Sequence, residues 1–338
     1  MAVTIEDVAE KADVSISTVS RVFNQSGRIS EGTREKVLAV ARDLNYSPRK
    51  YTKKRQGKNI GILINQFSLP ILNNPFYSLI LKGIEKELNK REFHLVFKTL
   101  VGKKDSDEQT VKSVLNDKQF KGLIVAGYGI DISLIKHIKD SPLPVVLVDN
   151  DHWDEDIDCV LNDNISGARK IVKGLVERGH ERIAFIGGPF SHVSFEKRYM
   201  GYKMALKENN IEKDNQLILF GDSSFQVEDG YKSTKKLLRR LDEKPTALFA
   251  VNDITAIGAM KAIKEYGYSI PEDIAVAGFD DINMGRHVSP ALTTVRVFKE
   301  NMGVQAAKRL LELNKNISKQ PIKIVLSVKP VFRGSTGD

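Results

Sequence analysis

The chain has 338 residues, of which 41% are hydrophobic, enough for two or three domains with buried cores. Its formal net charge is +9, and the excess is concentrated, because residues 1–60 hold 12 Lys and Arg against 7 Asp and Glu. Such a basic segment is typical of a module that binds a polyanion. The single cysteine, Cys159, argues against a disulfide or thiolate metal site, and no apolar stretch is long enough for a signal peptide or membrane span. We therefore expect a cytoplasmic protein without membrane attachment.

The stretch from Thr4 to Asn24 predicts two short helices joined by a tight turn. Thr4 can cap the first helix, with Asp7 reaching back in a variant of the capping box. The turn falls at Asp13, which tolerates the left-handed backbone better than most residues. Ser15 can cap the second helix. The predicted inward residues are Val8, Ala9 and Ala12, then Val19, Val22 and Phe23; the outward ones on the second helix are Ile16, Ser17, Ser20 and Arg21.

A third helix is predicted from its cap Ser30 to about Leu44, closing a three-helix core. A second helix that begins with small polar residues and presents Arg21 one turn later can lie in a major groove and touch base edges. The plain alternative is any small helical bundle, because helix-turn-helix geometry alone is a weak signal.

The runs TIEDVAEKADVSISTVSRVFN and SEGTREKVLAVARDLNYSP, covering Thr4 to Pro48, resemble the DNA-binding headpiece of the lactose-repressor (LacI) family of bacterial transcription regulators. The resemblance implies that Ile16, Ser17 and Arg21 read operator bases. It also implies that Thr18, Ser20 and Asn24 bind DNA phosphates or set the position of the headpiece along the duplex. The full set of expected DNA contacts is Thr4, Ser15, Ile16, Ser17, Thr18, Ser20, Arg21, Asn24, Arg28, Tyr46, Arg49, Lys53 and Arg55.

Residues 49–59 form a basic segment, with six Lys and Arg from Arg49 to Lys58 and no acid. A solvated linker accounts for it fairly well. The family resemblance implies instead a hinge that folds on DNA and inserts a leucine into the minor groove. Here Arg55 occupies that leucine position, and an arginine can enter a narrowed groove but cannot unstack bases as an apolar wedge does. We expect the hinge to grip phosphates or the groove, and whether it kinks the duplex stays open.

From Ile60 onward, apolar runs alternate with amphipathic helical patterns, which predicts parallel, doubly wound sheets. The alternation is too long for one sheet, so we expect two α/β subdomains with a cleft at the carboxyl ends of their strands. The strand-like runs are 60–64, 94–98, 122–126, 145–149, 182–187, 217–220, 247–251, 274–278 and 323–328. The helical patterns are 76–91, 107–117, 131–139, 165–178, 195–209, 228–241, 254–266 and 299–313.

The segments NNPFYSLILKGIE, ERGHERIAFIGGP and LFAVNDITAIGAMKAI resemble the effector domain of the same family, which is similar to periplasmic sugar-binding proteins. The resulting fold class is α/β: a helix-turn-helix headpiece plus two doubly wound parallel-sheet subdomains of periplasmic-binding-protein type. The expected domains are a headpiece at 1–48, a hinge at 49–59 and an effector-binding and dimerisation domain at 60–338. Within the last, the resemblance implies an N-subdomain of about 60–161 and 293–324 and a C-subdomain of about 162–292 and 325–338.

Polar residues follow the predicted strands where a ligand cleft would lie, as Asp149, Asn252 and Asp280 do. Carboxylates and amides bind neighbouring hydroxyls and an aromatic face covers a sugar ring, so this chemistry suits a polyol, although a purine remains possible. Trp153 and His192 are less favoured rim residues. By position in the family, the expected effector contacts are Phe76, Tyr128, Asp149, Arg198, Phe225, Asn252, Asp253 and Asp280.

No phosphate-binding loop, zinc-protease motif or nucleophile elbow occurs, and the histidines show no metal spacing. The acid-rich run DNDHWDEDID lacks the glycine and terminal glutamate of a calcium loop. We therefore expect no catalytic residues, no metal and no cofactor other than a small effector.

The predicted function is a homodimeric transcription regulator, with repression favoured, that reads a pseudo-palindromic duplex and responds to a small effector, a sugar being favoured. The dimer is expected to form through helices near 76–88 and 107–115, and the absence of a heptad tail argues against a coiled-coil tetramer. Two rivals remain. One is a regulator switched by a phosphorylated carrier protein, and the other is a pure solute-binding protein.

Overall fold

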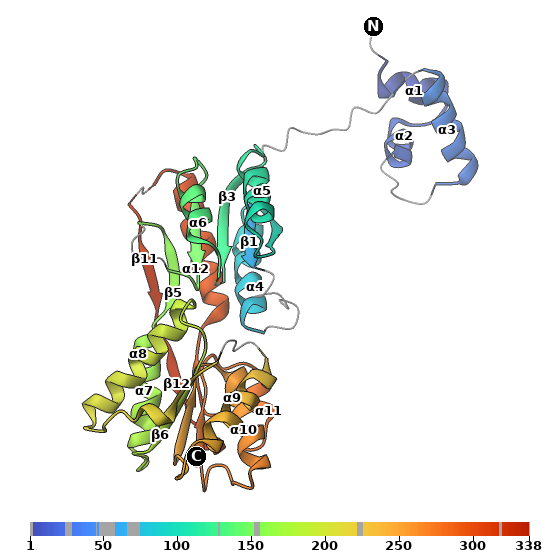
Figure 1. Cartoon of the computed structure of the whole chain (residues 1–338). Helices are drawn as coiled ribbons and strands as arrows, with labels where there is room; N and C mark the ends of the chain where they lie inside the picture. The colour runs from blue at the N-terminus through green and yellow to red at the C-terminus, as the bar shows by residue number, and fades with distance from the viewer. Residues whose placement is uncertain are drawn as a thin grey trace. The chain divides into compact units, whose positions relative to one another are not determined.

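The computed structural model describes residues 3–23, 29–44, 46, 58–65, 75–127, 129–151, 156–221, 226–317 and 320–337. Its internal contacts divide the chain into two compact units, Met1–Gly57 and Lys58–Asp338 (Figure 1). The proposed hinge contacts Arg49, Lys53 and Arg55 lie outside the described residues.

The first unit holds three helices: α1 (Ile5–Lys11), α2 (Ile16–Phe23) and α3 (Glu31–Asp43). The predicted capping box is present, because the Thr4 backbone N–H donates to Asp7 Oδ2 at 2.7 Å and the Asp7 N–H donates to Thr4 Oγ1 at 3.3 Å. Asp13 takes the left-handed conformation expected of the turn, with φ of 50°. The core consists of Val8, Ala9, Ala12, Val19, Val22, Val37 and Ala41, with Phe23, Val40 and Leu44 partly buried against it.

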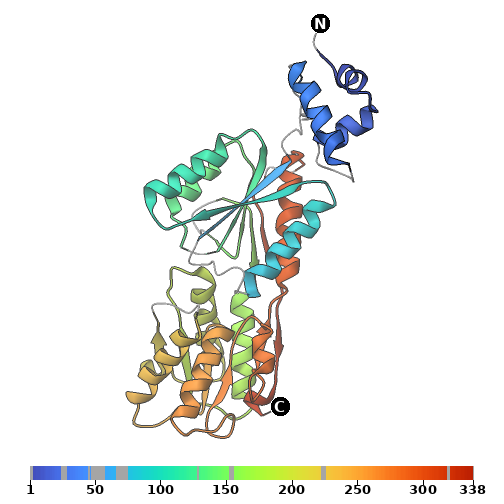
Figure 2. The ribbon, with the colours of Figure 1, turned by 90° about the vertical axis from the view of Figure 1, so that its right-hand side faces the viewer.

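The second unit contains a six-stranded, wholly parallel sheet in the order β11-β5-β4-β3-β1-β2. Alternate residues of β1 face opposite sides: Ile62 and Ile64 pack with α4 and α12, and Leu63 packs with α5 and α6. Figure 2 shows the helix pairs on the two faces of the fan of strands. The elements are β1 (Asn59–Asn65), α4 (Pro75–Asn89), β2 (His94–Leu100), α5 (Lys104–Leu115), β3 (Phe120–Ala126), α6 (Ile132–Lys139), β4 (Val145–Val148), β5 (Cys159–Asn162), α12 (Lys299–Asn314) and β11 (Lys323–Leu326).

A second parallel sheet follows the order β7-β6-β8-β9, with α7 and α8 on one face and α9 and α10 on the other. Two sheets, each covered on both faces, confirm the predicted doubly wound α/β class. The elements are α7 (Asn164–Val176), β6 (Ile183–Gly187), α8 (Val193–Glu208), a 3-10 turn (Asn215–Leu217), β7 (Ile218–Phe220), α9 (Val227–Arg239), β8 (Ala247–Ala250), α10 (Asp253–Glu265), β9 (Ala275–Ala277), α11 (Met284–His287), β10 (Thr294–Arg296), β12 (Lys329–Val331) and a 3-10 turn (Gly334–Thr336).

Two of the differences from the sequence expectation have a clear structural cause. The chain was expected to leave the second subdomain near Leu292-Thr293, but β10 pairs with β12 and the bridge Ala277–Thr293 joins it to β9. The crossing to the first sheet therefore follows β10. Helix α5 begins at Lys104 rather than near Asp107, because the Asp107 carboxylate binds the backbone N–H groups of Val101 and Gly102 instead of capping the helix.

Helix α12 is packed against α4 at the level of the backbone. A Cβ atom on Gly303 would lie 2.0 Å from the Ile80 carbonyl oxygen, and one on Gly83 would lie 2.0 Å from that of Glu300. Only glycine allows such an approach. The two helices therefore form one stiff layer, and its α4 end carries Phe76 and Tyr77.

Candidate functional site

Helix α2 presents an exposed face built for contact rather than packing. Val19 and Val22 are buried, whereas Ile16 is 47% exposed and Ser17 and Arg21 are also exposed. The first turn of α2 contains no acid, so nothing on it repels a phosphate. The exposed side of α2 is the one on which the sequence places the base-reading residues.

The remaining expected DNA contacts differ in exposure, and several also have a structural role in the headpiece. Ser15 Oγ accepts the Thr18 backbone N–H at 3.2 Å and so caps α2, while Thr18 and Ser20 are only partly exposed. The Thr4 hydroxyl is engaged in the capping box of α1. Tyr46 packs edge-on against Phe23 at 5.9 Å between ring centroids, which makes it a core residue as well. Asn24 and Arg28 lie outside the described residues.

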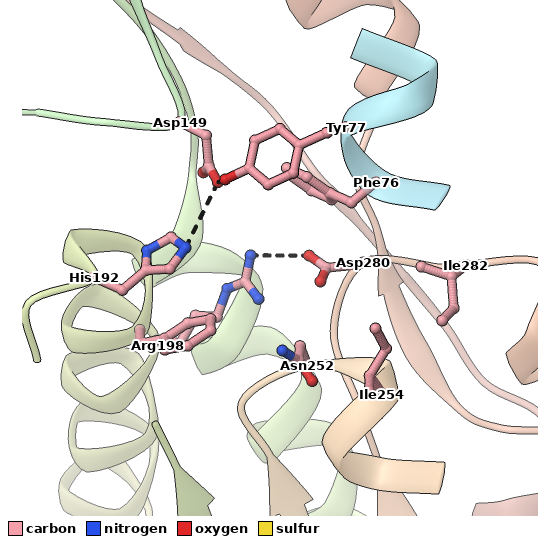
Figure 3. A pocket seen from close by; sticks show the side chains of 10 residues that line it. Phe76, Tyr77, Asp149, His192, Arg198, Asn252, Ile254, Asp280 and Ile282 are labelled. Carbon is pink, nitrogen blue, oxygen red and sulfur yellow. Dashed lines mark hydrogen bonds and ion pairs between the residues drawn. The ribbon is translucent and has the colours of Figure 1, made fainter. Parts of the chain in front are cut away.

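A pocket lies where the carboxyl ends of β4, β8 and β9 meet the first turns of α4 and α8. Figure 3 shows polar and aromatic side chains from these five elements pointing into it. The cavity volume is about 30 Å³. Its lining residues are Phe76, Tyr77, Asp149, His192, Phe195, Arg198, Asn252, Ile254, Asp280 and Ile282.

Asp149 joins the two lobes of the second unit, that is, the part built on the six-stranded sheet (first lobe) and the part built on the sheet β7-β6-β8-β9 (second lobe). Its carboxylate accepts from the Tyr77 hydroxyl of the first lobe at 3.1 Å and from Ser194 Oγ of the second at 2.8 Å. Burial raises the pKa of Asp149, partly offset by Arg198. His192 Nε2 lies 3.8 Å from the same carboxylate, but burial lowers the pKa of His192 to about 3, so the imidazole is neutral at pH 7 and this contact is no ion pair.

Arg198 is the central cation of the pocket. It is 2% exposed, and its Nε, Nη1 and Nη2 donate to Asn164 Oδ1, the Val251 carbonyl and Asp280 Oδ1 at 2.8, 2.8 and 2.9 Å. The guanidinium also lies 3.9 Å above the Phe279 ring. Burial raises the pKa of Asp280, against the lowering effect of Arg198. This network fixes Arg198 and leaves the second oxygen of Asp280 for other donors.

Asn252 and Asp253 are adjacent but have different structural roles. Asn252 Oδ1 accepts the Thr255 N–H at 2.8 Å, which caps α10, and its side chain borders the pocket. Asp253, expected to contact the effector, does not line the pocket. Its carboxylate instead accepts from the Ile282 N–H at 2.8 Å and, in a short bond, from the Thr294 hydroxyl, so that it braces the loop after β9.

The structure thus brings Phe76, Asp149, Arg198, Asn252 and Asp280 together. Tyr128 and Phe225 lie outside the described residues. Sequence reasoning missed several lining residues and gave His192 low weight. Helical spacing was the available signal for Phe195, one turn before Arg198 on α8. The missed residues are Tyr77, Phe195, Ile254 and Ile282.

Asp253 predicts a pH dependence of stability. Burial and the nearby Asp280 raise its pKa to about 8, so the folded chain keeps a proton that the unfolded chain releases above its usual pKa of 3.8. Stability should therefore fall as pH rises from about 4 to 8, by up to about 1.4 kcal/mol per pH unit for this group. In Asp253→Asn, an uncharged side chain that can still accept from Ile282, the fall should be weaker by that amount in urea titrations between pH 5 and 8.

Asp281→Asn is the matched control for this measurement. Hydrogen bonds from Arg333 and Arg296, with a weaker contribution from Arg286, outweigh burial and lower the pKa of Asp281 to about 2. Its contribution is fully present above pH 4, so the substitution should lower stability equally across pH 5–8. Parallel curves for wild type and Asp253→Asn would show that Asp253 is ionised in the folded chain.

Among the described residues, no group of His, Cys, Asp and Glu is placed to hold a metal ion, and no described helix could cross a membrane.

Each of the two units matches a known protein family. Residues 4–49 match the family model "Bacterial regulatory proteins, lacI family", and residues 172–336 match "Periplasmic binding protein-like domain". The chain is 34% identical to the transcriptional regulator DegA of Bacillus subtilis, over 99% of this chain and 98% of that protein. It is 32% identical to the ribose operon repressor of Haemophilus influenzae, over 98% of each.

Solved structures show the same likeness. A complex of the transcriptional regulator CelR with cellobiose superposes with a TM-score of 0.78 at 30% identity, covering 98% of this chain and 99% of that one. The lac repressor dimer bound to operator and an anti-inducer gives a TM-score of 0.76 at 30% identity, covering 99% of both chains.

Proposed function

The chain belongs to the LacI family of bacterial regulatory proteins and is a DNA-binding transcription regulator, and we propose that it is a homodimeric repressor whose operator affinity is set by a sugar in the pocket around Arg198. Because a transcription regulator acts on DNA, we place the protein in the cytoplasm with the nucleoid. Relatives of the chain are regulators, and we assign it no catalytic role.

Operator recognition rests on α2. Ile16, Ser17 and Arg21 occupy its exposed side, where an apolar side chain can meet a thymine methyl group and an arginine can bind guanine in a bidentate way. Two copies of the headpiece related by a two-fold axis would read a pseudo-palindrome.

The single observation that carries the ligand assignment is that three acceptor-bearing strand ends face one aromatic-lined pocket. Asp149, Asn252 and Asp280 offer carboxylate and amide groups to hydroxyls, and Phe76 and Phe195 offer ring faces. Two carboxylates favour a neutral, hydroxyl-rich ligand over an acidic one. The cellobiose bound by the similar CelR supports a carbohydrate here.

Ligand entry requires the pocket to change. A volume of about 30 Å³ is well below the roughly 300 Å³ of small-molecule sites, so a sugar must displace contacts around Asp149. The contact of Asp149 with Ser194 joins the two lobes, and its replacement by ligand hydroxyls would alter the angle between them. The sugar then acts through unequal affinity for the two lobe arrangements.

We place the dimer contact on α4 and the edge strand β2. Phe97 on β2 is 52% exposed and Leu79 on α4 is 37% exposed. Exposed apolar side chains on an edge strand favour association. The same face of a second copy would bury them in a two-fold symmetric dimer. This face includes the helix at 76–88 expected from the sequence.

The test combines DNA selection with a ligand panel. Duplexes selected from a random pool should share a pseudo-palindrome, and fluorescence anisotropy should show a change in operator affinity of about tenfold or more with one sugar of the panel. Asp149→Asn and Asp280→Asn should weaken that sugar's binding while retaining operator binding. Operator binding that responds to no sugar, with no heat in calorimetry, would refute the sugar assignment but not DNA binding.

A further inference from the structure

A second hollow lies on the outer helix of the second sheet and shares no lining residue with the pocket around Arg198. Its volume is about 420 Å³, and only cationic side chains line it. A neighbouring hollow of about 270 Å³ shares two of these cations, Lys232 and Lys236, and is lined by the carboxylate of Asp229 as well. The lining residues of the larger hollow, which we name the α9 basic site, are Lys232, Lys235, Lys236, Arg239 and Arg240.

Three of these cations are held in place by neighbouring elements. Arg240 donates from Nη2 to the carbonyls of Gln216 and Ile218 at 2.7 and 2.6 Å. Arg239 Nε donates to the Tyr266 hydroxyl at 3.2 Å. Lys235 Nζ, in turn, contacts Tyr231 and Glu265. A site whose cations are already oriented loses less side-chain entropy when it binds.

The positive charge of the α9 basic site is only partly neutralised. Glu265 pairs with Lys235 at 2.8 Å, and Glu228 lies 3.7 Å from Lys232. Among the described residues no ion pair is recorded for the other three, Lys236, Arg239 and Arg240. Cations in and next to the last turn complement the helix dipole, which explains Lys236, Arg239 and Arg240, but Lys232 lies too early in α9 for that effect.

The lining chemistry defines the ligand. Lysine and arginine bind phosphate oxygens in charge-assisted hydrogen bonds, and no apolar side chain is present to pack against a base or sugar ring. An open hollow of this volume has room for a small anion. We propose that the α9 basic site binds a compact anion carrying two or more phosphate groups.

The site is connected to the sugar pocket through rigid backbone contacts. A Cβ on Gly258 of α10 would lie 2.0 Å from the Val227 carbonyl, and one on Gly230 of α9 would lie 2.2 Å from that of Thr255. Helices α9 and α10 therefore move as one body. Because the pocket residue Asn252 caps α10, an anion on α9 is placed to influence the pocket.

The experiment is calorimetric titration of the full-length chain with pyrophosphate at roughly physiological ionic strength. Lys232→Gln/Lys236→Gln removes two cations that anchor no other element. Lys112→Gln/Lys118→Gln removes two exposed cations on and just after α5, one of which also has a glutamate one turn away. The headpiece contributes the same background to all three proteins.

We expect one saturable site per chain, weakened about tenfold or more by the α9 substitutions and less than twofold by the control. Circular dichroism should show the same melting for all variants. Binding that does not saturate, an equal loss in the control, or equal displacement by the same ionic strength of chloride would overturn the assignment. So would binding of a poly-glutamate peptide without binding of pyrophosphate. None of these results bears on the sugar proposal, which the ligand panel tests separately.

Discussion

Arg198→Met should lower the free energy of unfolding by about 3–5 kcal/mol, because it breaks the buried ion pair of Arg198 with the Asp280 carboxylate. The Asn164 side chain and the Val251 carbonyl lose their donors at the same time. Methionine keeps the aliphatic stem of arginine but ends where Nε lies, so the stacking of the guanidinium on Phe279 is lost together with the charge and the hydrogen bonds. Urea denaturation followed by circular dichroism measures the effect.

Two further variants sharpen this result. Arg169→Met removes an arginine that pairs with Glu208 at 2.8 Å on the surface, and it should cost no more than about 1 kcal/mol. Arg198→Met/Asp280→Asn should recover part of the loss, since removing both charges relieves the unpaired carboxylate. A cost of under 1 kcal/mol for Arg198→Met alone would mean that Asp280 is already neutral or hydrated.

The elements that were correctly predicted are those with a local physical cause. Thr4, Ser30 and Asp13 act through their own backbone neighbourhoods, so sequence alone places the ends of α1 and α3 and the turn. The long apolar runs of β1 and β3 likewise predict buried parallel strands, because the signal lies within each run. Their polar successors converge because parallel strands end at one edge.

Features with a distant cause could not be predicted. Strands β10 and β12 have three residues each, and they pair only because the chain crosses between sheets and returns. Strand β5 was missed for a related reason: its four residues pair mainly with β11, which is far away in the sequence, and only two of them pair with the nearby β4.

The same limit applies within the pocket. In the pairs Asn252-Asp253 and Asp280-Asp281, one member borders the pocket and the next points away. Neither pair follows the simple alternation of a strand, because Asp253 is already the first residue of α10, and Asp280 and Asp281 have φ of 113° and 49°. Asp253 turns to Thr294, and Asp281 turns to Arg296 and Arg333. Composition alone cannot say which member faces inward, because both are acids or amides at a strand end.

Arg21→Ala should weaken binding to the selected operator by about 10- to 100-fold, the effect of losing one bidentate base contact. Arg21 is exposed on the side of α2 opposite Val19 and Val22, so the three-helix core should fold unchanged. Lys36→Ala, an exposed cation on α3, is the matched control for the loss of one positive charge. Fluorescence anisotropy with selected and scrambled duplexes at several salt concentrations measures both.

The salt dependence separates base reading from phosphate binding at Arg21. If Arg21 reads a base, affinity for scrambled DNA should change little and the slope of log affinity against log salt should stay nearly the same. A phosphate contact would instead weaken both duplexes alike and reduce the slope by about 1. The second pattern would move base recognition away from Arg21 and onto Ile16 and Ser17, which make few distinctive hydrogen bonds and would leave the operator read largely by shape.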